Sequence, residues 1–370
     1  MGDIMKVITL LTAGHIGGIE TLCMDYAVHS RHDNLMLILW GDGHVDELMR
    51  AKGIRVLNLH ASKRNVAATV GRVMQVIRDE KADVLIAQHE ASMSHLCLMR
   101  AKMLFPNIHT IAYAQLNAVD MIRADEKKGL WLRRAVIGSS LKRADDVVAI
   151  SQSVKQSLLD VLNTPEDKIS VIYNGTDLAV FPYVPRNHSA EIMELMFTGR
   201  LIPEKGVQLT IRALSEVDDI SHYHFRIVGD GPYRRDLEKL AEELGVGDIT
   251  EFLGSRSDVP ELIKTADVFI HMPIWAEGFG ISVTEAMSSG CICVCADNGA
   301  MPELITDGED GYLVGKEDHI ALAHKLEEIY RMSAADKERI AMAAHAKAGV
   351  FSIERFVRDL DELALRGMNR

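Results

Sequence analysis

The stretch ADVFIHMPIWAEGFGISVTEAMSSGCICVCA, from Ala266 to Ala296, decides the fold class. It opens with an apolar run of strand length, passes through a glycine-containing loop into a helical pattern, and ends in a second apolar run. Two such runs joined by a helix predict a βαβ unit, because parallel strands need a crossover connection. The stretch therefore indicates a parallel sheet with helices on its faces.

The same alternation of apolar runs and helical patterns continues along the chain. It predicts strands over residues 5–11, 34–40, 54–59, 82–88, 108–114, 145–151 and 168–173, and again over 195–201, 222–229, 249–254, 266–272, 291–296 and 311–314. A polar stretch with two prolines separates the two series and is typical of a linker. We expect two doubly wound α/β domains facing each other across a cleft, at residues 1–181 and 193–352, with a linker at 182–192. A C-terminal helix is expected at 353–370, and its crossing back to the N-terminal domain is left open.

Composition and charge narrow the class of protein. The chain has 370 residues, of which 48% are apolar and 25% charged, and no apolar run approaches the length of about 20 residues that spans a bilayer. Residues 1–180 hold 21 Lys+Arg and 20 Asp+Glu, and residues 181–370 hold 20 and 33, so net charges of +1 and −13 sum to −12. An acidic second half argues against nucleic acid as a partner.

The five cysteines indicate a reducing compartment. The number is odd, and Cys291, Cys293 and Cys295 alternate along one strand with no histidine nearby, which favours packing over metal binding. The first segment lacks a basic region before its apolar core, so we interpret it as a buried strand and not as a signal peptide. We therefore expect a cytoplasmic protein.

Loops that directly follow strands carry the candidate site residues, because open α/β sheets bind ligands at the carboxyl ends of strands. Gly17 and Gly18 start a helix, where free backbone N–H groups suit a phosphate, although a tight turn is the favoured explanation when they are taken alone. Arg200 and Lys205 share one such loop and could bend toward one anion; a solvated surface pair is the alternative. Gly229 and Asp230 form a weaker signal of the same kind.

Two carboxylates lie around the helix start in the opening stretch. Glu277 precedes the helix and Glu285 lies about one turn inside it, with Gly278 and Gly280 leaving backbone amides free. A carboxylate can accept two O–H donors and so bind a sugar diol. The alternatives are a capping carboxylate for Glu277 and an exposed helix residue for Glu285.

Taken together, these stretches resemble the retaining glycosyltransferases of family 4, which have two Rossmann-like domains in the GT-B arrangement. The matching motifs are GGIE at Gly17–Glu20, YNGTDLAVF at Tyr173–Phe181, TGRLIPEKG at Thr198–Gly206, VGDGP at Val228–Pro232, PIWAEGFGISVTEAMSSG at Pro273–Gly290, with its E-x7-E pair, and MPELITDGEDGYLV at Met301–Val314. The resemblance covers nearly the whole chain, and the second half carries most of its specificity.

The resemblance implies a role for each candidate residue. Arg200 and Lys205 would neutralise the diphosphate of a nucleotide-sugar, Glu285 would hold the ribose diol, and Glu277 would contact the donor sugar. Backbone groups of Gly278, Phe279, Gly280 and Ile281, of Gly229 and Asp230, and of Gly17 and Gly18 in the other domain would complete donor binding. No metal or other cofactor is implied. A UDP-sugar is the first expectation for the co-substrate and GDP-mannose the second, with a hexose-type sugar transferred to a glycan or lipid-linked acceptor.

One departure concerns the first domain. Many relatives carry a histidine after its fifth strand, whereas this chain has Tyr113, Ala114 and Gln115 there. Gln115, Asn117 and His89 are candidates for an acceptor or sugar pocket, and plain lining of the pocket is the alternative for each.

The segment from Lys127 to Arg143 is basic and amphipathic, which suits an anionic membrane surface at the inner face of the cell. A solvated helix face is an equal alternative. Two other functions remain open: a non-catalytic nucleotide-sugar-binding partner of another transferase, and a nucleotide-sugar 2-epimerase of the same fold. The intact Arg200, Lys205, Glu277 and Glu285 weigh against the non-catalytic partner, and the missing histidine weighs slightly for it.

Overall fold

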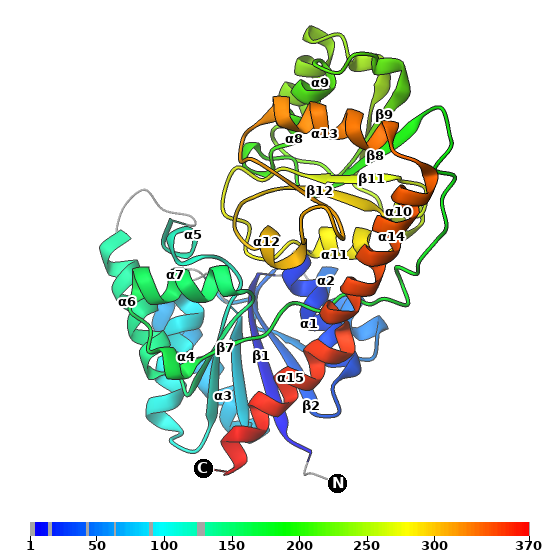
Figure 1. The fold of residues 1–370 in the computed structure, drawn as a ribbon. Coiled ribbons are helices and arrows are strands. Elements are labelled where there is room, and N and C mark those ends of the chain that lie inside the picture. The colour runs from blue at the N-terminus through cyan, green and yellow to red at the C-terminus, as the bar shows by residue number, and fades with distance from the viewer. Residues whose placement is uncertain are drawn as a thin grey trace. The chain divides into compact units, whose positions relative to one another are not determined.

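The computed structural model describes residues 4–13, 17–41, 44–62, 64–88, 92–123 and 130–369. The chain divides into two compact units, one made of residues 1–175 and 353–370 and the other of residues 176–352. The predicted linker 182–192 thus falls inside the second unit, and the C-terminal helix groups with the first. Each unit contains one parallel sheet with helices (Figure 1).

The first unit has a seven-stranded sheet in the order β3-β2-β1-β4-β5-β6-β7. Its central strands are apolar on both faces because helices cover both, and Val7 of β1 pairs with Val84 of β4 at the centre. The strands are β1 Lys6–Ala13, β2 Asp33–Trp40, β3 Arg55–Asn58, β4 Val84–Gln88, β5 His109–Ala114, β6 Asp146–Ala149 and β7 Ile169–Val171.

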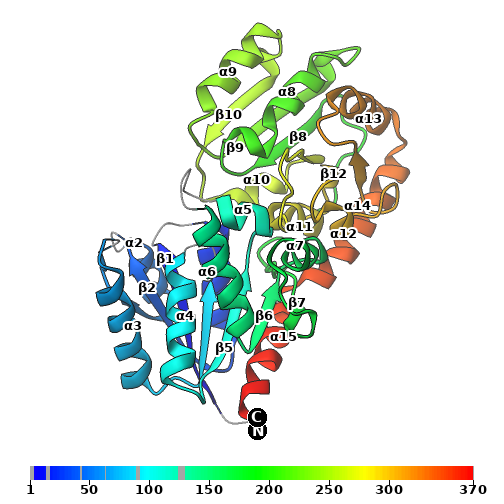
Figure 2. The same cartoon turned by 90° about the vertical axis from the view of Figure 1, so that its left-hand side faces the viewer.

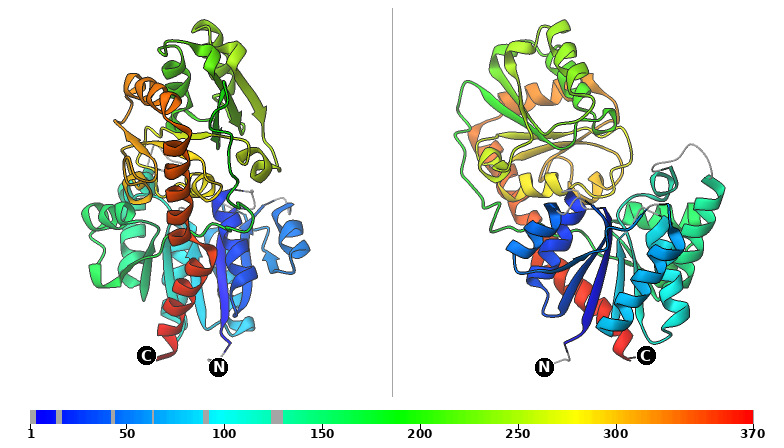
Figure 3. Two further views of the ribbon diagram at one scale, coloured as in Figure 1. Left: turned by 45° about the vertical axis from the view of Figure 1, so that its right-hand side comes forward. Right: turned by 180° about the vertical axis from the view of Figure 1, so that it is seen from behind.

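Helices cover the first sheet in two groups. The helices α3, α4 and α6 lie side by side on one face (Figure 2). The last helix, α15, packs beside α1 (Figure 3), where the Tyr26 hydroxyl donates to Asp361 at 2.8 Å. The helices are α1 Gly18–His29, α2 His44–Ala51, α3 Val66–Glu80, α4 Ser92–Leu104, α5 Ala118–Arg123, α6 Leu130–Arg143, α7 Gln152–Leu162 and α15 Ile353–Leu365.

The second unit has a six-stranded sheet in the order β10-β9-β8-β11-β12-β13. The strands are β8 Met193–Thr198, β9 Tyr223–Val228, β10 Thr250–Gly254, β11 Val268–His271, β12 Ile292–Ala296 and β13 Tyr312–Val314. The helices are α8 Val207–Leu214, α9 Arg234–Glu243, α10 Val259–Ile263, α11 Ile281–Ser288, α12 Met301–Leu304, α13 His319–Arg331 and α14 Ala334–Ala348. All thirteen predicted strands are confirmed, and so is the α/β class with two doubly wound sheets.

The cysteines pack as the sequence predicts. All five are buried and free, and Cys293 and Cys295 lie on β12 in the core of the second unit, directly after Cys291. Burial raises the pKa of each thiol, which keeps it protonated and unreactive.

Candidate active site

The candidate site of the second unit lies at the point where its strand order reverses. From β8 the chain proceeds outward to β9 and β10, then returns to β11 on the other side of β8, so that the loops after β8 and β11 lead in opposite directions. Such a switch point leaves a crevice at the carboxyl ends of the strands. The two loops are joined here, since the Ile274 amide donates to the Glu204 carbonyl at 2.9 Å.

Two glycines allow the loops after β8, β9 and β11 to pack closely. Gly206 has a φ of +73°, and a Cβ added to it would lie 1.7 Å from the Met272 carbonyl oxygen. Gly229, with a φ of +134°, would bring a Cβ to 1.9 Å from the Gly199 carbonyl oxygen. Only glycine fits both the conformation and the space, so these positions fix the distance between the loops.

Lys205 and Glu277 form the centre of the site. The Lys205 Nζ lies 2.6 Å from Glu277 Oε2, and the two side chains are 21% and 14% exposed, so solvent reaches both. The same Nζ lies 5.6 Å from the ring centroid of Trp275, within cation–π distance. The structure thus brings together two residues that lie far apart in the sequence and that the motifs assign to one donor site, although an ion pair between them was not predicted.

Three opposing influences set the charge of Glu277. Burial alone would raise its pKa, but the Lys205 ammonium and the hydrogen bond from His271 outweigh it, and the pKa falls well below the ordinary value. Glu277 is therefore a carboxylate over the whole physiological range. It can accept hydrogen bonds but cannot donate a proton as a general acid.

His271 is a site residue that the sequence analysis missed. It ends β11, is fully buried, and stacks on Phe197 with ring centroids 6.2 Å apart. Burial lowers its pKa despite the nearby Glu277, so the imidazole is neutral. Its Nε2 lies 3.3 Å from Glu277 Oε2 and must carry the proton, because an ionised carboxylate only accepts. The available signal was a single polar residue at the end of the apolar run VFIH.

Asn298 also holds this loop and was not predicted. Its side-chain amide donates to the carbonyls of Pro273, Ile274 and Trp275, and the Ala300 amide donates to the Glu277 carbonyl at 2.9 Å. The backbone on both sides of Glu277 is thereby fixed before any ligand binds.

Arg200 is exposed on the loop that carries Lys205. Within the described ranges its guanidinium has no carboxylate partner, and no contact joins it to Lys205 or Glu277. The structure therefore groups Lys205 with Glu277. Arg200, on the same loop as Lys205, is open to solvent, where it could bind an anion.

The predicted donor-binding residues around α11 differ in what they can offer. Gly278 and Gly280 lie in the loop before the helix, and Gly280, with a φ of +104°, is the residue that precedes Ile281. The Phe279 ring is 2% exposed and packs edge-on against Phe351, so only its main chain can contact a ligand. Glu285 is half-buried on α11.

The other predicted donor-binding residues lie at loop ends. Asp230 is exposed and accepts the Gly231 amide at 2.7 Å, which stiffens the turn after Gly229. Gly17 and Gly18 are exposed at the start of α1 in the first unit. His89 lies outside the described residues.

The predicted pocket residues of the first unit form hydrogen bonds within that unit. Gln115 is buried, donates to Gln88 at 3.1 Å and accepts from Asn174, whose side chain also accepts from the Tyr113 hydroxyl at 3.2 Å. Asn117 accepts the amides of the first turn of α5. Both residues therefore have structural partners, and their role in acceptor binding stays a prediction.

Comparison with known proteins identifies the family. Residues 16–180 match the model described as Glycosyltransferase Family 4, and residues 187–348 match the model described as Glycosyl transferases group 1. The chain belongs to glycosyltransferase family 4. An uncharacterized glycosyltransferase of Methanocaldococcus jannaschii is 29% identical to this family-4 protein over 60% of this chain and 58% of that one.

Two further relatives extend the comparison. WcaL of Salmonella typhimurium, whose name assigns it provisionally to colanic acid biosynthesis, is 28% identical over 56% of this chain and 52% of its own. The chain thus spans little more than half the length of these two curated relatives. The crystal structure of Anabaena HepE in complex with UDP-glucose has 24% identity and a TM-score of 0.84, covering 97% of this chain and 99% of that chain, and confirms the GT-B fold.

In the part of the chain that the structure describes, no three His, Cys, Asp or Glu residues are grouped as metal ligands. Within the same ranges no helix is long and apolar enough to cross a membrane.

Proposed function

We propose that this glycosyltransferase moves a hexose-type sugar from a nucleoside-diphosphate sugar to a glycan or lipid-linked acceptor, with retention at the anomeric carbon, in surface polysaccharide or glycoconjugate synthesis. The observation that carries the proposal is the Lys205–Glu277 ion pair at the switch point, with the exposed Arg200 on the same loop. Family membership supports the reaction class, and the name of WcaL supports the biosynthetic setting.

The cations are proposed to bind the diphosphate. Breaking the bond between the anomeric carbon and the phosphate oxygen leaves extra negative charge on the departing diphosphate. Lys205, held at 2.6 Å from Glu277, and Arg200 would stabilise that charge in the transition state, which is the function that a metal ion serves in other transferases. We therefore propose turnover without an added divalent metal.

The carboxylates are proposed to bind hydroxyl groups at the two ends of the donor. Glu277, ionised and fixed by His271 and Asn298, would accept from the sugar, and Glu285 would accept from the ribose diol. Donor contacts are also proposed for the main chain at Gly278, Phe279, Gly280, Ile281, Gly229 and Asp230, and for the start of α1 at Gly17 and Gly18.

The low pKa of Glu277 argues against proton transfer by this residue. We propose a front-face reaction, in which the acceptor oxygen bonds to the anomeric carbon on the side that the phosphate leaves. The acceptor proton passes to the departing phosphate oxygen, so that atoms and charge balance without a protein base.

The identity of the donor is open to a direct binding measurement. We propose a UDP-sugar first, in line with the UDP-glucose bound by the structural neighbour HepE, and GDP-mannose second. The nucleotide-sugar that raises the melting temperature most is the donor, since a ligand that binds only the folded state stabilises it in proportion to its affinity.

Slow hydrolysis of that donor tests the reaction. We expect release of the sugar with its anomeric configuration retained, seen by NMR, in the presence of EDTA. Lys205→Ala should lower the rate at least ~100-fold, the scale for a lost transition-state contact. Lys239→Ala, which removes an exposed lysine paired with Glu243 on α9, is the matched control.

Three outcomes would contradict the proposal. Full activity in Lys205→Ala would overturn the site assignment. Donor binding without any hydrolysis or transfer would favour a non-catalytic partner protein. Conversion of the sugar within the nucleotide-sugar would indicate a 2-epimerase.

We also propose a peripheral association of the Lys127–Arg143 segment with an anionic membrane surface at the cytoplasmic face. Lys127 and Lys128 lie outside the described residues, and α6 begins at Leu130. Arg133 and Arg134 donate to the carbonyls of Met121 and Val161, so both are anchored to the protein. What supports the proposal is the exposed start of α6, where Trp131 is 77% and Leu132 53% exposed.

A further inference from the structure

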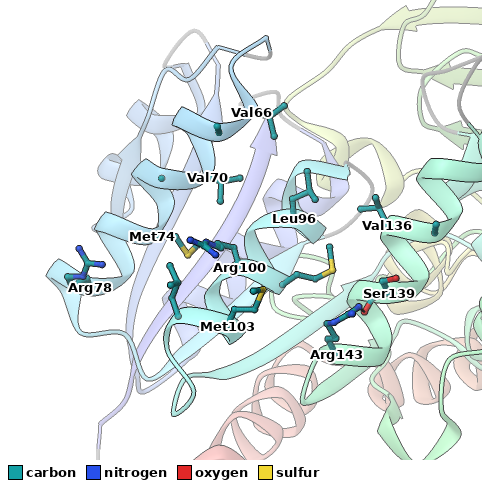
Figure 4. Close-up of a pocket in the computed structure, with 15 residues that line it drawn as sticks. Val66, Val70, Met74, Arg78, Leu96, Arg100, Met103, Val136, Ser139 and Arg143 are labelled. Atoms are coloured by element: carbon teal, nitrogen blue, oxygen red, sulfur yellow. Dashed lines mark hydrogen bonds between the residues drawn. The ribbon is translucent and has the colours of Figure 1, made fainter.

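A long apolar groove crosses the helical face of the first unit, apart from every donor-binding and acceptor-pocket residue discussed above. It has a volume of about 880 Å³ and runs along α4 between α3 and α6 (Figure 4). Val66, Leu96 and Val136 lie toward one end of the groove, and Arg78, Met103 and Arg143 toward the other. The lining also includes Val70, Met74, Met99 and Leu104.

Several large apolar side chains that line the groove are exposed. Val66 is 43% exposed, Leu104 42% and Met103 68%. Covering such side chains is favourable by roughly 25 cal/mol for each Å² removed from water. Methionine side chains are flexible, so the surface made by Met74, Met99 and Met103 can adapt to a flexible apolar chain.

Positive charge accompanies the apolar lining. The residues around the groove include Arg78, Arg100 and Arg143 and no acidic residue. In the described part of the chain none of the three guanidinium groups is ion-paired; Arg143 donates to the Ser139 carbonyl and Arg78 lies over the Phe105 ring. The groove therefore suits an occupant with an anionic group and a long apolar portion.

Charge and the neighbouring surface favour a lipid over a protein occupant. Two copies of this chain facing each other through the groove would bring like-charged arginines together, which disfavours a symmetric dimer. A partner helix in the groove would leave Trp131 and Leu132 at the start of α6 uncovered. A bilayer surface covers both, because tryptophan favours the membrane interface and arginine favours anionic headgroups.

We propose that this groove binds anionic phospholipids of the membrane surface, with an acyl chain along α4 and the anionic headgroups at the arginines of its three helices, Arg78, Arg100 and Arg143. The proposal rests on the membrane association proposed above. It assigns that association to a defined groove, where the sequence had indicated only a basic amphipathic helix. Lipid binding at this groove requires neither a bound donor nor catalytic turnover.

Flotation with phosphatidylcholine vesicles, with and without phosphatidylglycerol, tests the proposal on the full chain. We expect binding only with phosphatidylglycerol, and a loss of about fivefold in affinity for each arginine removed, reaching about 100-fold in Arg78→Ala/Arg100→Ala/Arg143→Ala. The variant Arg50→Ala/Arg212→Ala/Arg339→Ala, which removes the same charge at exposed arginines on helices that do not line the groove, should change affinity far less. Unchanged melting temperatures show that the variants fold.

A second variant separates the acyl chain from the headgroup. Met99→Ser/Met103→Ser keeps every charge and should weaken vesicle binding severalfold, and glycerol phosphate alone should not compete. Vesicle binding that neither groove variant alters would overturn the groove while leaving membrane association intact. Absence of binding to any vesicle would overturn both, and so would a dimer in solution that the arginine variant dissociates.

Discussion

The two units place polar side chains at the same edge of the same kind of sheet, but the two clusters differ in charge. Beside β8 and β11, Lys205 and Glu277 form a partly exposed ion pair. At the carboxyl ends of β4 and β5, Gln88 and Gln115 form a buried neutral pair with Asn174. The Lys205–Glu277 cluster of the second unit leaves charge available to a charged ligand. In the first unit, the amide groups bond to one another. The proposed diphosphate would therefore find its counterpart in the second unit.

The largest expected effect concerns the charged cluster. Glu277→Gln keeps the shape of the side chain but removes the charge that fixes Lys205 and accepts from His271. We expect kcat for donor hydrolysis to fall by at least ~100-fold. Glu238→Gln, an exposed carboxylate paired with Arg234, is the control and should retain full activity. Equal activity in both variants would mean that the cluster is structural only.

The next effect tests whether the charged cluster depends on the close loops beneath it. Gly206→Ala combines a left-handed φ of +73° with a Cβ 1.7 Å from a carbonyl oxygen, so the loop must move. We expect a loss of at least about 2 kcal/mol in the free energy of unfolding, measured with urea. Gly71→Ala in α3, where a Cβ meets open space, should instead stabilise by about 0.5 to 1 kcal/mol.

The neutral cluster should respond in stability more than in chemistry. Gln115→Leu leaves Gln88 and Asn174 buried without their partner, which costs about 1 to 3 kcal/mol in the free energy of unfolding. Gln156→Leu removes an exposed glutamine that bonds Asp160 on α7 and should cost little. If Gln115→Leu instead lowered donor hydrolysis as far as Glu277→Gln does, the contrast between the two clusters would be wrong.

Two buried histidines, one in each unit, extend the comparison to the pH dependence of stability. Burial, with a smaller effect of Arg133, lowers the pKa of His95 in the first unit to about 4, and within the described ranges neither ring nitrogen has a partner. Protonation thus favours the unfolded state, whose histidine pKa is near 6.5. The stability from neutral His95 is complete above pH 6.5 and is lost as pH falls toward 4, at up to about 1.4 kcal/mol per pH unit.

His95→Leu should therefore flatten the fall in melting temperature between pH 6.5 and pH 4. His324→Leu, at an exposed position of α13, should leave the slope as it is. His271 has the same direction of shift, but its bond to Glu277 opposes it, so His271→Gln should flatten the slope less. An unchanged slope in His95→Leu would place the pH sensitivity elsewhere.

Sequence reasoning predicted the elements of regular structure better than the contacts between loops. All thirteen strands follow from apolar runs, because buried parallel strands are apolar on both faces. Lys205 and Glu277 were predicted through motifs. The contacts of His271, Trp275 and Asn298 depend on how separate loops pack, and no local pattern encodes that packing.

The first unit shows the same limit of prediction from sequence. The bond between Gln115 and Gln88 arises because β4 and β5 are neighbours, which a prediction of separate strands does not supply. The basic segment at Lys127–Arg143 indicated a charged surface, but the groove above α4 is created by three helices that are distant in sequence. Only the assembled face shows apolar and cationic side chains together.

The position of α15 has a consequence for the order in which the protein forms. The hydrogen bond from Tyr26 to Asp361 joins residues 335 positions apart, whereas residues 176–352 form their unit from one continuous segment. During synthesis the second unit can therefore complete its fold while the first still lacks a helix and leaves one side of α1 uncovered. The part of the chain that emerges first from the ribosome is the last to be finished.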